Sequence, residues 1–374
     1  MNNRIDKILS ERVFTKESLV ELLNANTDDT AKIFAEARKI KKEYIGNKVH
    51  LRGLIELTNY CTKNCYYCGI ASGVKNVNRY MLSMPEVEQA IRFIHENHYG
   101  GIVIQSGELQ SEKFVSLIEE ILHKANSISG NTLGITLSCG EQIPETYKRW
   151  KDAGAHRYLL RIEASNRDLY YKLHPRNKKH DFETRVSALY SLKELGYQTG
   201  TGVMIGLPFQ TVEDLASDLL FMRDFDIDMC GMGPYIEHED TPLYKFAHLA
   251  VNKTQKVQLS LKMIAILRIM MKDINIAATT AMQTLINGGR EMALKAGANI
   301  LMPNTTPGIF REHYSLYKNK PGLYEEAADS KDMIEKLIQR TGSITGYGEK
   351  GNAPHYYRRC RSLNSQSLPT TNRS

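Results

Sequence analysis

The stretch LRGLIELTNYCTKNCYYC (residues 51–68) starts as an apolar run and ends in a loop that holds three of the six cysteines of the chain. Its first part, Leu51–Thr58, is typical of a strand. Cys61, Cys65 and Cys68 follow at intervals of four and three residues. Thiolates bind soft and borderline metals, so this stretch predicts a metal centre placed directly after a strand.

An iron–sulfur cluster fits these thiolates better than a zinc ion or a disulfide framework. A closed structural zinc site needs four ligands, usually in two pairs, and Cys139, Cys230 and Cys360 are scattered along the chain. In a 4Fe–4S cluster each iron takes one outside ligand, which a cysteine supplies. Three cysteines would hold three irons and leave the fourth open as a reaction site.

The composition is that of an ordinary globular protein. Of the 374 residues, 42% are hydrophobic and 24% are charged. No apolar run approaches the ~20 residues of a membrane span, and the polar N-terminus has no signal-peptide core. We therefore expect a cytoplasmic protein with reduced thiols and no membrane partner.

The net charge of +7 raises the question of a nucleic-acid partner. The densest basic clusters are KKHD (178–181), in an expected loop, and YYRRCR (356–361), near the C-terminus. The other basic residues are spread along the chain and form no block that would indicate an RNA-binding module. We interpret the charge as a solvated surface and expect no nucleic-acid partner.

Short apolar runs alternate with helical patterns along most of the chain. The runs are 51–58, 101–106, 133–138, 157–163, 200–208, 228–234, 274–280 and 298–303. Several of the amphipathic stretches between them end in Gly, a common helix stop. An alternation repeated about eight times predicts an α/β fold, a parallel (β/α)8 TIM barrel. A doubly wound sheet is the rival, but no Gly-rich fingerprint follows the first strand.

We divide the chain into an N-terminal helical extension (1–48), the barrel (49–350) and a C-terminal tail (351–374). The last fourteen residues, 361–374, are polar and expected to be disordered. Catalytic groups of such a barrel lie at the C-terminal ends of the strands. The residues at these predicted ends are Ser106, Gly107, Glu108, Thr136, Ser138, Arg161, Glu163, Met204, Gly206, Thr279, Thr280 and Asn304.

The cysteine spacing, with the aromatic Tyr67 before the third cysteine, resembles the signature of the radical S-adenosylmethionine (SAM) enzymes. Longer segments resemble the HydE family of FeFe-hydrogenase maturases within that superfamily, from about residue 45 to about residue 350. They include RGLIELTNYCTKNCYYCGI, QSGE, RYLLRIEASNRDLYYKLHP, MIGLPFQT, DTPL, IAATTAMQTLINGGRE and AGANILMPNTTP. The last two segments separate this family from biotin synthase and methylornithine synthase, which share the barrel.

The resemblance implies roles for individual residues. Cys61, Cys65 and Cys68 would hold a single 4Fe–4S cluster. The residues implied to bind SAM are Tyr67, near the adenine, Ser106, Gly107, Glu108, Glu163 and Arg185. Arg185 would clamp a SAM carboxylate, for which a guanidinium is well suited. The residues implied to bind anions and substrate or to line the inner cavity are Thr136, Arg157, Arg161, Met229, Thr279, Thr280, Met302 and Tyr314.

The sequence departs from the family pattern in two places. Ile162 and Ala164 replace a His and a Thr of the family pattern. The neighbouring residues Arg161 and Glu163 match that pattern. Some family members carry three further cysteines that hold an accessory cluster. Gly322, Ser330 and Met333 stand at those positions here, and none of them ligates iron as a thiolate does. We therefore expect no second cluster.

The resemblance implies an anaerobic enzyme of hydrogenase H-cluster assembly, in the formation of the two-iron core and its dithiomethylamine bridge. Its substrate would be a small iron–thiolate or cysteine-derived compound. Its partners would be the other hydrogenase maturases, with reduced ferredoxin or flavodoxin as electron donor. Two alternatives remain open, an amino-acid mutase of the methylornithine synthase type on the same barrel and a tRNA-modifying or nucleic-acid-binding protein.

Overall fold

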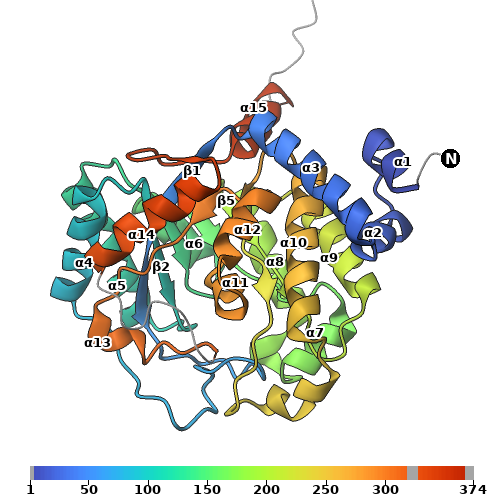
Figure 1. The fold of residues 1–374 in the computed structure, drawn as a ribbon. Helices are drawn as coiled ribbons and strands as arrows, with labels where there is room; N and C mark the ends of the chain where they lie inside the picture. Colours follow the sequence, from blue (N-terminus) through green and yellow to red (C-terminus); the bar gives the residue numbers. More distant parts are fainter. Residues whose placement is uncertain (1–3, 318–326, 367–374) are drawn as a thin grey trace, which may run out of the picture.

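The computed structural model describes residues 4–317 and 327–366, and its main strands form one parallel ring (Figure 1). The hydrogen-bonded order is β10-β1-β2-β3-β4-β5-β7-β9. A parallel bridge between Ala277 and Ile300 joins the end of β9 to β10 and completes the ring. The strands are β1 (Lys48–Thr58), β2 (Gly101–Ser106), β3 (Gly134–Ser138), β4 (Arg157–Leu159), β5 (Gln198–Thr201), β7 (Met229–Cys230), β9 (Asn275–Ile276) and β10 (Ile300–Leu301). The predicted (β/α)8 barrel is confirmed.

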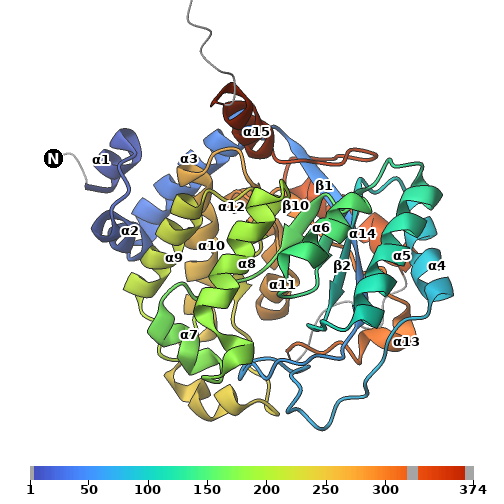
Figure 2. The same ribbon diagram turned by 180° about the vertical axis from the view of Figure 1, so that it is seen from behind.

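Helices follow the strands and surround the ring, as the view from behind also shows (Figure 2). They are α4 (Met84–Glu96), α5 (Glu112–Ser129), α6 (Pro144–Asp152), α7 (Arg167–Leu173), α8 (Phe182–Glu194), α9 (Val212–Phe225), α10 (Lys253–Met270), α11 (Thr280–Leu285), α12 (Gly289–Ala296), α13 (Gly308–Arg311) and α14 (Ala327–Arg340), with the 3-10 segments η1 (Lys178–His180) and η2 (Pro242–Leu249). Local sequence sets several starts: Ser83 and Glu86 form a capping box at α4, as do Thr211 and Asp214 at α9.

Three helices precede the barrel and pack on its outside. They are α1 (Arg4–Glu11), α2 (Lys16–Leu23) and α3 (Thr27–Tyr44), with α2 against α9 and α3 against α10. Buried lysines tie them to the barrel helices. Lys262 Nζ donates to the carbonyls of Leu23 and Ala25, and Lys41 Nζ donates to the carbonyl of Leu294. These bonds satisfy charged groups that burial would otherwise penalise.

Several strands are shorter than the apolar runs predicted. The run 157–163 is a strand only as β4, and Glu163 adopts a left-handed backbone with φ of 66°. The runs 200–208 and 228–234 break into β5 and β6 (Met204–Ile205) and into β7 and β8 (Gly233–Pro234). Because β6 pairs with β8 rather than with the main sheet, the barrel wall splits there, close to its C-terminal rim.

The C-terminal segment closes the N-terminal end of the barrel. β11 (Ile344–Thr345) pairs with the start of β1, and α15 (Pro354–Gln366) lies in Figures 1 and 2 at the end opposite α7. Arg359 forms a buried ion pair with Asp228 at 2.6 Å. Residues 361–366, which we expected to be disordered, continue this helix, whereas 367–374 lie outside the described residues. The domain boundaries at 48 and 350 stay predictions.

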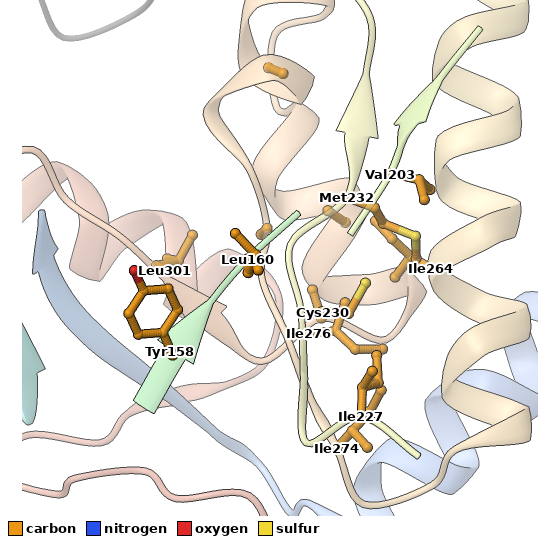
Figure 3. Close-up of a cluster of buried hydrophobic side chains, with 14 of the residues drawn as sticks. Tyr158, Leu160, Val203, Ile227, Cys230, Met232, Ile264, Ile274, Ile276 and Leu301 are labelled. Atoms are coloured by element: carbon orange, nitrogen blue, oxygen red, sulfur yellow. The ribbon is translucent and has the colours of Figure 1, made fainter. Parts of the chain in front are cut away.

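The core lies between the ring and the surrounding helices. Figure 3 shows part of it, a cluster that includes Ile227, Cys230, Ile274, Ile276 and Ile264 of α10. Cys139 and Cys230 are both buried there, 0% and 3% exposed, so these two thiols serve as small apolar core groups. Among the helices in the described ranges, none is both long and apolar enough to cross a membrane.

Candidate radical SAM site

The three clustered cysteines lie on the loop that leaves the C-terminal end of β1. The β1–β2 pairing skips one residue between Glu56 and Thr58, which makes a bulge immediately before the loop. Such bulges bend a strand and redirect the residues that follow. Cys61, Cys65 and Cys68 all line one cavity of about 650 Å³ at this end of the barrel, which confirms the expected position at a strand end.

The three thiols are half-buried and line the cavity. Burial raises the pKa of the Cys65 thiol well above its ordinary value and that of Cys68 to about 12. Cys61 Sγ accepts a hydrogen bond of 3.3 Å from the backbone N–H of Glu108, the kind of contact that tunes cluster sulfurs. Binding iron at these thiols must release their protons, which couples metal loading to pH. All three are free cysteines and their donor set fits a 4Fe–4S cluster.

No group of three or more His, Cys, Asp or Glu residues in 4–317 and 327–366 is arranged to hold a single metal ion.

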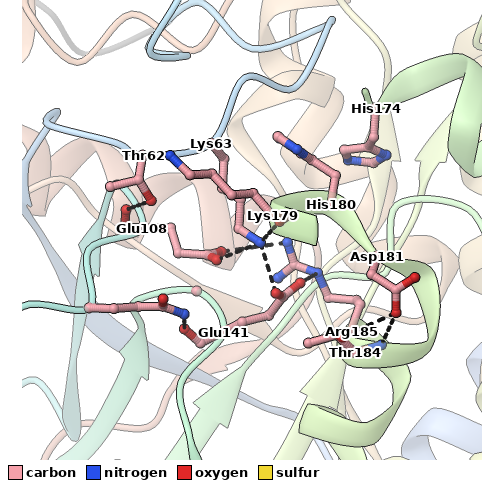
Figure 4. A network of polar contacts seen from close by, with 12 residues as sticks. Thr62, Lys63, Glu108, Glu141, His174, Lys179, His180, Asp181, Thr184 and Arg185 are labelled. Carbon is pink, nitrogen blue, oxygen red and sulfur yellow. Dashed lines mark hydrogen bonds and ion pairs between the residues drawn. The ribbon is translucent and has the colours of Figure 1, made fainter. Parts of the chain in front are cut away.

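A buried network of four charged side chains lies beside the cysteine loop (Figure 4). Lys63 of that loop is 2.9 Å from Glu108 and 2.8 Å from Glu141. Arg185 of α8 is 2.7 Å from Glu141 and 3.5 Å from Glu108. All four side chains are at most 10% exposed. Two cations and two carboxylates thus connect the cysteine loop, the ends of β2 and β3, and α8.

The network shifts the pKa of two of its members, Glu108 and Arg185. Burial raises the pKa of Glu108, against the opposing effect of Arg185. Burial alone would lower the pKa of Arg185, but Glu141 and Glu108 hold it well above its ordinary value. Arg185 is therefore a permanent cation, and it lines the cavity. A guanidinium has five N–H donors, so Arg185 has capacity for a third carboxylate.

A second charged pair lies across the cavity. Arg161 is 2.8 Å from Glu163 and also donates to the carbonyl of Val203. Glu163 keeps its left-handed backbone because its N–H bonds to the carbonyl of Gly202 and its carbonyl accepts from Met204. A non-glycine residue in this conformation is strained, and such strain gathers at functional sites.

Other residues that line the cavity carry buried polar atoms that are not hydrogen-bonded to the described residues. The Nε of Arg161, the Oγ1 of Thr279 and the Oε1 of Gln283 are buried and have no hydrogen-bond partner among residues 4–317 and 327–366, while all three residues line the cavity. Unsatisfied buried polar groups cost free energy. A bound ligand with both donors and acceptors would relieve that cost.

Most of the predicted site residues meet in this cavity. Those that line it are Cys61, Cys65, Tyr67, Cys68, Ser106, Gly107, Glu108, Arg161, Glu163, Arg185, Thr279, Thr280, Met302 and Tyr314. The strand-end residues Ser138, Met204 and Asn304 line it too. Of the positions predicted to lack accessory-cluster cysteines, Met333 lines the cavity, Ser330 belongs to α14, and Gly322 lies outside the described residues.

Three predicted substrate residues lie elsewhere. Arg157 and Met229 are the first residues of β4 and β7, at the N-terminal end of the barrel. Arg157 donates to Thr136 Oγ1 at 3.0 Å and to Asn352 at 2.6 Å, and Met229 Sδ accepts from Arg52. The cavity lining does not include Thr136, Arg157 or Met229. Their assignment to substrate binding stays a prediction that the cavity does not support.

Sequence reasoning missed two members of the buried network, Lys63 and Glu141. Lys63 stands inside the cysteine motif itself, and Glu141 follows β3 by three residues. The rule that functional groups follow barrel strands would have selected Glu141. That rule does not predict that the side chains of Lys63 and Glu141, which are 78 residues apart in the sequence, contact each other.

The comparisons with known proteins decide the family. Residues 55–222 match the model of the radical SAM superfamily. The chain is 42% identical to the [FeFe] hydrogenase maturase subunit HydE of Thermotoga maritima over 339 residues, which are 90% of this chain and 94% of that protein. The chain belongs to the HydE family. It is thus a radical SAM enzyme that uses a 4Fe–4S cluster and SAM, as the resemblance implied.

The relatives outside the HydE family are less similar. The chain is 26% identical to the 3-methylornithine synthase of Methanosarcina acetivorans over 339 residues, 89% of this chain and 91% of that protein. A crystal structure of methylornithine synthase (PylB) superposes with a TM-score of 0.76 at 24% identity, covering 92% of this chain and 98% of that one. That likeness confirms the barrel fold alone.

Proposed function

We propose that this HydE-family enzyme acts with other hydrogenase maturases in assembly of the FeFe-hydrogenase H-cluster, on a small iron–thiolate or cysteine-derived substrate. The observation that carries the proposal is the shared cavity: three thiols on one side and a cation with uncommitted hydroxyl and amide groups on the other. The 42% identity to the Thermotoga maritima maturase supports the same assignment. Action in the cytoplasm is part of the proposal.

In this proposal the two ends of the cavity have different tasks. Cys61, Cys65 and Cys68 hold the cluster, which when bound supplies the electron that cleaves SAM into methionine and a 5′-deoxyadenosyl radical. Arg185 binds the SAM carboxylate, and Tyr67 lines the same cavity. The Ser106–Glu108 turn lies beside the cysteines, where its backbone N–H already contacts Cys61. The protein's task at this end is to orient SAM and exclude water.

We assign Arg161, Thr279, Thr280, Met302 and Tyr314, which all line the cavity, to the substrate end. The guanidinium supplies positive charge and the hydroxyls supply donors, which suits a carboxylate or a cyanide ligand on iron. Met302 and the buried ring of Tyr314 supply apolar wall. Charged contacts formed in an enclosed, low-dielectric space are stronger than in water, so a small anionic complex would be held without large contact area.

Anaerobic turnover tests this function. Reconstituted enzyme is given SAM, a strong chemical reductant and either an iron–cysteine complex with CO and cyanide ligands or a free amino acid, and 5′-deoxyadenosine is measured with the products. We expect the iron complex to raise SAM cleavage well above the rate without substrate. Stimulation by the free amino acid, with a rearranged amino-acid product, would instead support the methylornithine synthase-like alternative, which the 26% identity keeps as second candidate.

A further inference from the structure

The basic cluster KKHD (178–181), which sequence analysis assigned to a solvated loop, lies directly on the cysteine loop. The backbone N–H of Tyr66 donates to the carbonyl of Leu173 at 2.9 Å. The backbone N–H of Asn64 donates to His180 Nε2 at 2.9 Å, and Lys63 Nζ contacts the carbonyl of Lys179. The segment 172–180 therefore forms an outer cover over the loop that holds the three cysteines. We call it the cover segment.

The cover segment has an inner and an outer side. Its inner side is made of His174 and His180, which are buried, and the His174 ring meets the Tyr67 ring edge to face with centroids 5.4 Å apart. Tyr67 OH and His174 Nε2 are 3.3 Å apart. The outer side is made of Lys172, Arg176, Lys178 and Lys179, all exposed. The inner side thus contacts Tyr67, which lines the cysteine cavity, while the outer side is a cationic surface.

The outer side carries uncompensated positive charge. Residues 172–180 contain four lysine or arginine residues and no carboxylate. Among the described residues no carboxylate forms an ion pair with these four side chains, because Glu183 pairs with Arg167 and Asp181 accepts from Thr184 and Tyr171. Unpaired surface charges of one sign attract an oppositely charged partner and steer its approach.

We infer that the cover segment is the docking surface for a small acidic electron-carrier protein that reduces the cluster. This rests on the proposed function, since an enclosed cluster must receive its electron from outside. The carrier is oxidised by one electron, the cluster accepts it, and no bond forms or breaks. Charge complementarity and the position of the segment over the cysteine loop support this partner. A nucleic acid would also be attracted by the positive charge, but it transfers no electron, so it does not account for the position of the segment over the cysteine loop.

Binding of reduced flavodoxin to the reconstituted enzyme tests the inference. The variant Arg176→Glu, Lys178→Glu, Lys179→Glu reverses three charges of the outer side without touching the cavity lining. The matched control is Arg38→Glu, Lys39→Glu, Lys42→Glu, which reverses one arginine and two lysines exposed on α3. We expect the first variant to lose about ten- to a hundred-fold in flavodoxin affinity at low salt and the control to stay within about three-fold. The affinity of the unmodified enzyme should fall as NaCl rises from about 20 to about 300 mM.

SAM cleavage driven by dithionite separates this inference from the proposed function. The small reductant needs no docking surface, so the charge-reversed variant should cleave SAM with dithionite at the normal rate but slowly with flavodoxin. Loss of dithionite-driven cleavage in the unmodified enzyme would count against the proposed function itself. Unchanged flavodoxin affinity in the charge-reversed variant would overturn the docking surface. So would an effect confined to binding of a single-stranded RNA oligonucleotide, which would make the segment a nucleic-acid surface.

Discussion

The Nε of Arg185 lies 2.7 Å from a carboxylate oxygen of Glu141, and the two side chains are only 10% and 6% exposed. Arg185 is thus engaged before any SAM carboxylate arrives. The terminal guanidinium nitrogens of Arg185 do not take part in this 2.7 Å contact. One of them lies 3.5 Å from Glu108. The structure therefore gives Arg185 two tasks, joining α8 to the ends of β2 and β3 and facing the cavity.

Replacing Arg185 should affect SAM binding and folding together. A charge-assisted hydrogen bond is worth about 1.5–3 kcal/mol, so Arg185→Ala should weaken SAM binding about ten- to a hundred-fold. It also leaves Glu141 and Glu108 buried with less compensation, and breaking a buried pair typically costs about 3–5 kcal/mol of stability. Equilibrium SAM binding and urea unfolding of the same preparation measure the two effects.

Glu141→Gln is the matched control, because it removes the ion pairs of Glu141 with Arg185 and Lys63 and keeps the guanidinium. We expect this variant to be less stable than the unmodified protein but to bind SAM within about three-fold of the normal affinity. A SAM affinity of Arg185→Ala within two-fold of normal would show that another group binds the carboxylate.

Iron content tests the cluster assignment. Reconstituted protein should contain about four irons per chain, bound through Cys61, Cys65 and Cys68. Cys65→Ala should lose most of this iron and all SAM cleavage while the barrel stays folded by circular dichroism. Cys360→Ala, on α15 away from the cavity, is the control and should keep the iron. About eight irons per chain would contradict the single cluster, and one zinc would contradict the radical SAM assignment.

The sequence predicted the barrel and the cysteine loop because both are local patterns. Strand–helix alternation and three closely spaced thiols can be recognised without knowing what lies beside them. The position of a residue along the barrel axis, near the N-terminal or the C-terminal end of its strand, cannot be recognised in this way. Thr136 and Arg157 pair across β3 and β4, and residues near either end of a strand show the same apolar and polar alternation. The family resemblance grouped these two residues with Arg161, and no pattern in the sequence showed that they lie in a lower layer.

Contacts between distant loops could not be predicted either. Lys63 meets Glu141 only because β1, β2 and β3 are neighbours in the ring and end at the same rim. The sequence contains both residues in functional loops, but the desolvation that makes their pairing necessary appears only after folding. The cover segment is a similar case, since its charge was visible and its position over the cysteines was not.

Stability should depend on pH through His355 of α15. Burial would lower the pKa of His355, but hydrogen bonds with Asp226 and Asp273 outweigh it and raise the pKa to about 9. A raised pKa in the folded state stabilises fully below the unfolded value, about 6.5, and the contribution is lost as pH rises through 9. The free energy of unfolding should therefore fall by up to about 3 kcal/mol between these pH values.

Denaturant unfolding of the unmodified protein and His355→Gln at both pH values measures this contribution. Glutamine keeps a polar side chain but has no proton to lose, so its unfolding free energy should change much less across the window. Equal pH dependence of the two proteins would assign the effect to other groups. Because α15 lies at the end of the barrel opposite α7, SAM binding at either pH should be unaffected by the substitution.

The last prediction concerns Thr279, the residue before α11. Thr at such a position often caps a helix with its side chain, and losing a cap costs about 1 kcal/mol. Here the Thr279 side chain makes no capping bond, and its buried Oγ1 has no hydrogen-bond partner in the part of the chain that the structure describes. Thr279→Val should therefore leave the melting temperature unchanged or slightly raised, because it removes an unsatisfied buried hydroxyl and keeps the shape.

The same substitution should harm turnover if the hydroxyl serves the substrate. We expect Thr279→Val to bind SAM normally but to raise the fraction of SAM cleaved without product, and Thr279→Ser to restore coupling because it keeps the hydroxyl. Thr280→Val differs, since Thr280 Oγ1 bonds to Tyr317 OH at 2.8 Å, and its loss should cost about 1 kcal/mol of stability. A Thr279→Val enzyme that melts several degrees lower yet couples SAM cleavage normally would make Thr279 a structural residue and leave Arg161 as the anion contact of the cavity.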